Sequence, residues 1–262
     1  MMAMWRTYQI ARVPLAGYVD FLWLSESYRQ PHAAELILPT ATVDMIVDLA
    51  RVESPRSVVS GVHSRAVELD TAGPLSLIGA RFKPGGASAL LGIPAGELHN
   101  CMVSLETVWG DRGEQLREQL HFATLPMRRF QILEEFLAEC LRGQTPLSDV
   151  VRHSVKAIHA AGEPVSVQRL SLDGGMNAVR FSTLFRDQVG LTPKSYAKIV
   201  RLRRAIAAIG RTTCVDWASM ALGCGYFDQA HFNHDFRDFC GMSPSKYLTC
   251  RTGHPNHVVK AD

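Results

Sequence analysis

The sequence predicts an α+β chain, with a β-rich N-terminal part that also carries helices and an all-helical C-terminal part. Three observations lead to this prediction: alternating apolar residues before residue 83, a unit that occurs twice after residue 165, and a difference in charge between the two halves. The 262 residues suffice for two domains, and 47% apolar residues suffice for ordinary cores. Disordered and fibrous chains are thereby excluded.

The N-terminal part, residues 1–145, has short apolar runs that are typical of strands. The runs are separated by Pro, Gly and Ser and lie at residues 35–39, 44–49, 58–62 and 75–82. They predict a small β-rich sheet or barrel. Helices are expected at residues 87–91, 105–109, 113–120 and 128–142. The apolar face of the last helix fits either the core of its own domain or a second copy of the chain.

Residues 81–86 read Arg-Phe-Lys-Pro-Gly-Gly just before a helix. Such a loop fits an anion site at a helix start, but it also fits a tight strand-to-helix turn with a solvated Arg and Lys, which we favour. The histidines of this part, at positions 32, 63, 99 and 121, lack the spacing of a metal cage. No nucleophile, P-loop or dinucleotide motif occurs, so we expect no catalytic residue, metal or cofactor.

Six cysteines are spread thinly, with no Cys-x-x-Cys pair, and free thiols are expected. No run approaches the roughly 18 apolar residues of a membrane span, and residues 1–10 lack the apolar stretch of a signal peptide. We therefore expect a cytoplasmic chain without a membrane partner.

The charge is distributed unevenly along the chain. Residues 1–149 contain 13 Lys and Arg against 17 Asp and Glu, whereas residues 150–250 contain 13 against 7. An asymmetry of this kind indicates that the basic half meets a polyanion.

An internal repeat organises the basic half. Seven residues recur at an offset of 51: Phe181, Phe185, Arg186, Asp187, Gly190, Pro193 and Tyr196 return as Phe232, Phe236, Arg237, Asp238, Gly241, Pro244 and Tyr247. So many identities at one offset indicate one supersecondary unit used twice.

Each unit reads as two helices joined by a glycine-containing turn. In the first unit, about residues 165–190, Ser166 and Asn177 are the expected caps of helices 167–172 and 178–189. In the second, about residues 214–240, helix 215–222 precedes Asp228 and helix 229–239. This order is that of a helix-turn-helix, whose second helix can enter the major groove of DNA.

A basic, amphipathic connector helix is expected between the units, at residues 193–209. About 17 residues at 1.5 Å each give a rod of roughly 25 Å. With the turns at its ends, it could hold two recognition helices near the roughly 34 Å between successive major-groove faces.

The motif residues of both units carry a resemblance. Residues 225–232, Gly-Tyr-Phe-Asp-Gln-Ala-His-Phe, with Phe236-Arg237 and residues 241–247, Gly-Met-Ser-Pro-Ser-Lys-Tyr, resemble the signature of AraC/XylS-type transcriptional regulators. Residues 191–196 and 201–205 are also similar to that family. The resemblance covers about 148–250 and implies two helix-turn-helix subdomains that bind duplex DNA to control transcription. The order of elements in 1–145 resembles a sensing or dimerisation domain often attached to such halves.

The helical wheel and the resemblance imply which residues contact DNA. The phenylalanines of both recognition helices should face inward. The expected base readers are Val179, Ser182, Thr183, Gln229, Ala230, Asn233 and His234. The expected phosphate contacts are Arg186, Lys194, Ser195, Arg237, Ser245 and Lys246. Arg186 and Arg237 fit ion pairs with Asp187 and Asp238 equally well.

Duplex DNA is thus the expected partner, and RNA polymerase, a small-molecule effector and a second copy of the chain are further partners open to test. Two alternatives compete with a regulator: a DNA-repair alkyltransferase with a reactive cysteine, and an architectural binder without sequence preference. Thinly spread cysteines speak against the first, and different outward residues on the two helices against the second.

The remaining segments are connections. Residues 143–146 are the expected linker between the two parts, Ser148 is the expected cap of the next helix, and residues 251–262 are expected to be a disordered tail.

Overall fold

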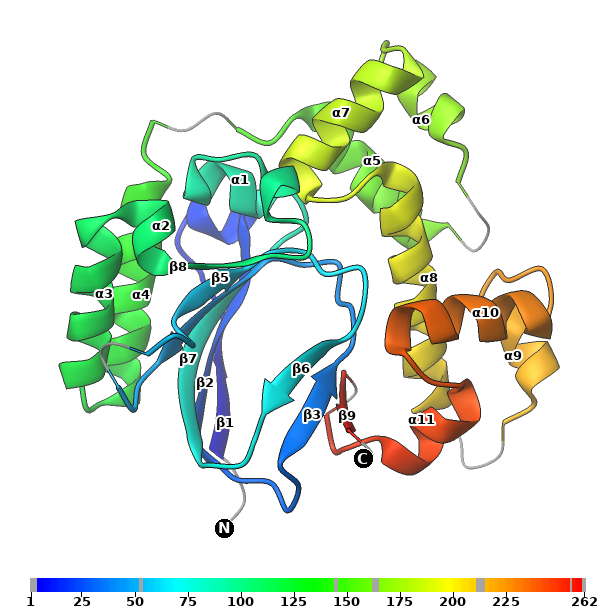
Figure 1. Cartoon of the computed structure of the whole chain (residues 1–262). Helices are drawn as coiled ribbons and strands as arrows, with labels where there is room; N and C mark the ends of the chain where they lie inside the picture. The colour runs from blue at the N-terminus through cyan, green and yellow to red at the C-terminus, as the bar shows by residue number, and fades with distance from the viewer. Residues whose placement is uncertain are drawn as a thin grey trace.

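The computed structural model describes residues 4–51, 54–143, 146–161, 165–210, 215–254 and 256–260. Figure 1 shows two β-sheets with helices in the N-terminal part and a helical C-terminal part beside them. The predicted α+β class is confirmed. Within the described residues, no helix has the length and apolar character needed to cross a membrane.

The larger sheet is antiparallel and has the strand order β1-β2-β7-β4-β5-β8. In strand β4, near the centre of this sheet, successive side chains point to opposite faces. Met45 and Val47 are fully buried in the main core, whereas Asp44 and Ile46 point to the other face. The strands are β1 (Met4–Tyr8), β2 (Val19–Tyr28), β4 (Asp44–Asp48), β5 (Val58–Ser60), β7 (Leu75–Phe82) and β8 (Met102–Ser104).

Helices cover the Met45 face of this sheet. Leu116, Leu120 and Leu133 belong to the same buried cluster as Met45, and Figure 1 shows α3 and α4 on the side away from the smaller sheet. The last predicted helix of this part therefore buries its apolar face in its own domain. The helices are α1 (Gly86–Leu91), α2 (Leu105–Trp109), α3 (Asp111–Phe122) and α4 (Pro126–Cys140), with short 3-10 turns η1 (Leu15–Gly17) and η2 (Ala95–Leu98).

The smaller sheet corrects the prediction for the C-terminal tail. Its order is β6-β3-β9, with β6 (Val67–Asp70), β3 (Ala34–Ile37) and β9 (His257–Val259). β9 pairs antiparallel with β3, so that Val258 lies opposite Leu36 and is fully buried. The prediction of a disordered tail at 251–262 was wrong for residues 256–260, because the strand obtains its hydrogen bonds from a partner more than 200 residues away.

Seven helices form the described C-terminal part, and the repeated unit appears in them twice. α6 and α7 form the first helix-turn-helix, α9 and α10 the second, and α8 joins the units as expected. The helices are α5 (Asp149–Ala160), α6 (Val167–Asp173), α7 (Ala178–Val189), α8 (Pro193–Ile209), α9 (Trp217–Gly223), α10 (Gln229–Cys240) and α11 (Pro244–Cys250).

Caps set these helix starts, with one correction. Ser166, Asn177 and Asp228 accept hydrogen bonds from the amides of the helices they precede, as predicted. Ser148 stands at the predicted cap position of α5, but its side chain makes no such bond, and its backbone amide donates to the side chain of Gln188. The predicted linker includes residues 144–145, and the predicted second unit begins at residue 214. These positions lie outside the described residues.

Both units share their cores with the N-terminal part. Phe181 and Phe185 of α7 join the cluster that contains Met45, while Leu38 and Val258 join the core around Phe232 and Phe236. The two helix-turn-helix units are therefore packed against the β-rich part.

Candidate nucleic-acid interface

The first recognition helix, α7, separates an aromatic inner face from a polar outer face. The Oδ1 atom of Asn177 accepts the amide hydrogen of Arg180 at 2.9 Å. Phe181 and Phe185 are fully buried, which confirms the predicted inward stripe. Of the expected base readers on this helix, Val179 is 77% exposed, Thr183 is exposed and Ser182 is half-buried.

The second recognition helix, α10, is arranged in the same way. The Oδ1 atom of Asp228 accepts the amide hydrogen of His231 at 2.7 Å, and Phe232 and Phe236 are fully buried. The expected readers Gln229, Ala230 and His234 are exposed, whereas Asn233 is half-buried.

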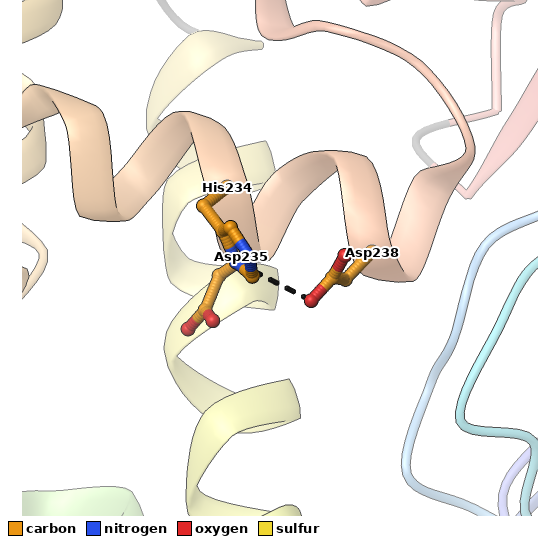
Figure 2. A group of neighbouring side chains, drawn as sticks. All are labelled: His234, Asp235 and Asp238. Atoms are coloured by element: carbon orange, nitrogen blue, oxygen red, sulfur yellow. Dashed lines mark ion pairs between the residues drawn. The ribbon is translucent and has the colours of Figure 1, made fainter.

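His234 has a partner within its own helix. Its Nδ1 atom lies 3.3 Å from the Oδ2 atom of Asp238, and Figure 2 shows this pair along the exposed side of α10. Asp238 therefore pairs with His234 rather than with Arg237, the partner considered from the sequence. Arg237 is exposed.

Asp235, drawn beside this pair in Figure 2, has a different role. Its side chain is 2% exposed and accepts hydrogen bonds from Lys198 at 3.1 Å and Arg201 at 2.8 Å. His234, Asp235 and Asp238 are the residue types that bind metals. Both oxygens of Asp235 are nevertheless occupied by α8 cations, so this carboxylate joins α10 to α8.

Four of the six expected phosphate contacts lie at the starts of α8 and α11. Thr192 and Ser243 cap these helices by accepting the amide hydrogens of Ser195 and Lys246, each at 3.2 Å. The side chains of Lys194, Ser245 and Lys246 are exposed, and that of Ser195 is half-buried. The repeat thus presents one lysine beside each of two equivalent caps.

Arg186 lies where α7 meets the N-terminal part. Its side chain is 57% exposed, with the Nε atom 4.0 Å from the Oδ1 atom of Asp187, a distance at the limit of an ion pair. A Cβ on Gly96 would come within 3.1 Å of both the Cγ atom and the carbonyl oxygen of Arg186. The C-terminal end of α7 therefore packs closely on η2, while Val179 near its N-terminal end is exposed.

Most cations of the connector helix are used inside the protein. Arg204 donates to the terminal carbonyls of α5, those of Ile158, His159 and Ala161. Arg203 donates to the carbonyl oxygen of Thr40 at 3.0 Å, and burial lowers its pKa. The basic excess that the sequence shows is thus partly structural, and the exposed basic charge is smaller than composition suggests.

One exposed aromatic residue next to the second recognition helix was not predicted from the sequence as part of the interface. Phe227 is 85% exposed and directly precedes the cap of α10. Leu172 and Leu222, 50 residues apart, are 75% and 61% exposed at the ends of the first helices of the two units. Their equivalent positions in the repeat could have drawn attention to them.

Two of the thiols buried in the described part of the chain do not resemble an alkyltransferase site. Cys140 and Cys240 are buried, and burial raises the pKa of both thiols, whereas a nucleophile needs a lowered pKa. The five cysteines within the described residues are free.

The loop at 81–86 is a structural turn. The Nε atom of Arg81 lies 2.9 Å from the Oδ1 atom of Asp44, and the Nζ atom of Lys83 donates to the carbonyl oxygen of Ala16 at 2.7 Å. The predicted turn from strand to helix is confirmed, since β7 ends at Phe82 and α1 begins at Gly86. The prediction that Arg81 and Lys83 are solvated was wrong, because both cations are engaged within the domain.

A cavity of about 270 Å³ lies in the N-terminal part, on the Ile46 face of the larger sheet. Its lining is mainly apolar and aromatic and includes Trp23 and Leu77. Two lining residues, His254 and His257, follow the last helix of the C-terminal part.

Comparisons with known families divide the chain as the structure does. Residues 173–249 match the family described as a helix-turn-helix domain (HTH_18), and residues 10–104 match a domain of unknown function (DUF6597).

Two curated relatives are described as transcriptional regulators. The probable transcriptional regulator LumQ of Photobacterium leiognathi is 34% identical over 83 residues, or 32% of this chain and 33% of LumQ. The HTH-type transcriptional regulator AlkR of Acinetobacter baylyi is 26% identical over 172 residues, or 57% of this chain and 54% of AlkR. The chain therefore spans about a third and about half of these two relatives.

Similar solved structures include a probable AraC family transcriptional regulator from Rhodopseudomonas palustris, 30% identical, with 39% of this chain and 96% of that chain covered and a TM-score of 0.35. ToxT from Vibrio cholerae is 12% identical, with 97% and 100% covered and a TM-score of 0.43. The repeated units, the family match over 173–249 and the two curated relatives agree. Residues 173–249 belong to the AraC-type family of helix-turn-helix domains.

Proposed function

We propose that this protein is a sequence-specific, DNA-binding transcriptional regulator whose two recognition helices read adjacent major-groove segments. The repeated geometry carries the proposal: α7 and α10 bury their phenylalanines and expose their N-terminal polar positions. The 17-residue helix α8 between them has a length of roughly 25 Å. A helix of this length suits two recognition helices that lie about one turn of B-DNA apart.

Gln229 and Lys246 are proposed to act on DNA in different ways. Gln229 lies in the first turn of α10 and can pair with an adenine edge, whereas Lys246 can neutralise a phosphate. The other proposed base readers are Val179, Ser182, Thr183, Ala230, Asn233 and His234. The other proposed phosphate contacts are Arg186, Lys194, Ser195, Arg237 and Ser245.

Selection of bound duplexes from a random pool by the full chain tests the function directly. We expect enrichment of an asymmetric motif of about two helical turns, because the outward residues of α7 and α10 differ. Equal retention of all duplexes would favour an architectural binder instead.

Two substitutions then test the contact assignment on the selected site. Gln229→Ala should cost about 1–3 kcal/mol and relax the choice of base at one position. Lys246→Ala should weaken all sequences alike and reduce the salt slope by about one. Lys156→Ala, an exposed lysine on α5, is the matched control and should leave both quantities unchanged. A loss of base choice in Lys246→Ala would reverse the assignment.

We further propose that the N-terminal part modulates DNA binding through a small-molecule effector. The support is its cavity and its shared cores with both helix-turn-helix units. RNA polymerase and a second copy of the chain are the other partners proposed. Native mass spectrometry with and without duplex DNA tests the second copy, and a pull-down with polymerase on the selected duplex tests the first.

A further inference from the structure

The cavity in the N-terminal part is built from segments at both ends of the sequence. Trp5 and Trp23 stack at its edge with ring centroids 5.1 Å apart, and His254 lies 6.0 Å from the ring of Trp5. The C-terminal segment, residues 251–254 and 256–260, thus supplies part of the wall. It does so immediately after α11 of the second helix-turn-helix unit.

The C-terminal segment is held in place by the strand that borders the cavity. The amide of Leu38 donates to the carbonyl oxygen of Asn256 at 2.8 Å, and the amide of Lys260 donates to the carbonyl oxygen of Ala34 at 3.1 Å. The Nζ atom of Lys260 also lies 2.6 Å from the Oε2 atom of Glu68 on β6. These contacts join β9 to β3 and β6 along one side of the cavity.

The buried carboxylate of Glu35 also holds the C-terminal segment. The side chain of Glu35 is fully buried and lies 2.7 Å from the Nδ1 atom of His257 and 2.8 Å from the Nε2 atom of His32. Tyr28 donates to the same carboxylate at 3.0 Å. Burial opposes ionisation of Glu35, but hydrogen bonds from His257 and His32 outweigh it and lower its pKa. His257 is therefore oriented by Glu35 and not left free for a charged ligand.

The charged residues that line the cavity balance each other, and the nearby Arg203 is bonded to the carbonyl oxygen of Thr40. Arg81 and Asp44 pair with each other at 2.9 Å, with side chains only 21% and 15% exposed. Burial lowers the pKa of His254 to about 4 and also lowers the pKa of His63, so both rings are neutral at pH 7. A charged ligand would have to lose its hydration without gaining a free counter-ion, which is costly.

Size and lining narrow the ligand class further. A cavity of roughly 150 Å³ with an apolar lining holds benzene. The volume of about 270 Å³ seen here, with Phe21, Trp23 and Met102 in its wall, suits a molecule of about two rings. Thr7, Thr42 and Tyr28 also line the cavity, and their hydroxyl oxygens can accept a hydrogen bond from a polar substituent.

We propose that this cavity binds an uncharged aromatic ligand of about two rings, and that the bound ligand packs on the C-terminal segment and so holds β9 against β3. The inference extends the proposed function, because it gives the effector a chemical class and a direct route to the second helix-turn-helix unit. Binding that secures β9 also secures α11, which ends at Cys250. The ligand and the second recognition unit are then separated by a few residues of chain.

Titration calorimetry of the full chain with three matched probes tests the site without DNA. The probes are 2-naphthamide, 2-naphthoate and 2-naphthylmethylammonium, which share two rings and differ in charge. We expect 2-naphthamide to bind at least about ten-fold more tightly than either ion. Equal or tighter binding of an ion, or no binding of the amide, would overturn the ligand class.

Two substitutions at one position test the location. Ile46→Trp places a large side chain in the cavity and should abolish 2-naphthamide binding, whereas Ile46→Val leaves the space open and should retain it. Circular dichroism of both variants checks that they are folded. His254→Ala should weaken binding several-fold, and His153→Ala, an exposed histidine on α5, should not change it. Unchanged binding in Ile46→Trp would overturn the location.

Hydrogen exchange tests the route to β9. With 2-naphthamide bound, the amides of Leu38 and residues 256–260 should exchange more slowly, while those of α4 should be unaffected. An unchanged rate at β9 despite binding would overturn the proposed contact with the C-terminal segment. Because no DNA is present, these results test the ligand site separately from the proposed function. If the chain selects no duplex but binds 2-naphthamide, the proposed regulatory function is contradicted and the ligand site is not.

Discussion

Single side chains of this protein connect elements that the repeat alone would leave independent. Asp235 accepts hydrogen bonds from Lys198 and Arg201, and Arg201 in turn lies 4.3 Å from the ring centroid of Tyr226. The corresponding position of the first unit is Leu184, so the repeat is not symmetrical here. The second recognition helix is fixed to the connector by charge, and the first by apolar packing.

Loss of the Asp235 carboxylate should be costly. Asp235→Ala leaves two cations without their partner in a mostly buried site, which should lower the free energy of unfolding by about 3 kcal/mol. Asp238→Ala removes an exposed pair and should cost less than about 1 kcal/mol. Urea denaturation of both variants measures the difference, and equal costs would show that the Asp235 contacts contribute little.

The pKa of His254 predicts a dependence of stability on pH. The pKa is lowered to about 4, chiefly by burial and then by His257 and Arg81, with Glu35 opposing and Arg203 adding to the shift. The unfolded chain takes up the proton near pH 6.5, so stability is complete above that pH and declines as pH falls toward 4. The slope is at most about 1.4 kcal/mol per pH unit.

His254→Gln removes this group and should flatten the decline between pH 7 and 5. Urea denaturation of the parent chain and the variant over this range measures the difference in slope, which also subtracts the contributions of His63 and His159. Identical slopes would contradict the assignment.

At the scale of elements, caps and aromatic stripes made the recognition helices predictable. Asp228 replaced by Ala should lower the free energy of unfolding by about 1 kcal/mol, because the amide of His231 loses its acceptor. Asp228→Asn keeps an acceptor and should be nearly neutral. Thermal melts of the two variants make the comparison, and a neutral alanine variant would show that α10 does not depend on its cap.

Elements set by distant contacts could not be predicted from the sequence. β9 has three residues and no periodic signal, and it exists because β3 offers a free edge. β2 was missed because Leu22 to Ser25 are buried in succession, which hides the alternation expected of a strand. The outward face of α10 could be predicted from a helical wheel. The pairing of His234 with Asp238 depends on side-chain conformations, which the sequence pattern does not give.

Across the whole molecule, the two halves share cores and should unfold together. Leu38 of the N-terminal part is buried among residues of the second helix-turn-helix unit, and the amide of Ala66 donates to the carbonyl oxygen of Phe239 at 2.8 Å. Neither contact can be predicted from a short stretch of sequence, because each joins residues that are far apart in the chain. The predicted order of domains therefore said little about how closely the two halves pack.

A substitution at Leu38 tests this coupling. Leu38→Ala should cost about 2–5 kcal/mol through the cavity it leaves, and it should destabilise residues 229–250 as well as β3. Leu125→Ala, at a side chain 68% exposed, should change stability by less than about 0.5 kcal/mol. Hydrogen exchange resolved by segment gives the measurement, and a loss confined to β3 would mean that the halves are independent.

The pairing of β9 with β3 also has a consequence for biosynthesis. Residues 34–37 leave the ribosome long before residues 257–259, so more than 200 further residues must be synthesised before the smaller sheet receives its third strand. Until then Glu35 lacks His257, and the edge of β3 is open to other chains. A nascent chain cut short before β9 would therefore expose an unpaired strand, which makes truncated products of this protein candidates for aggregation or early degradation.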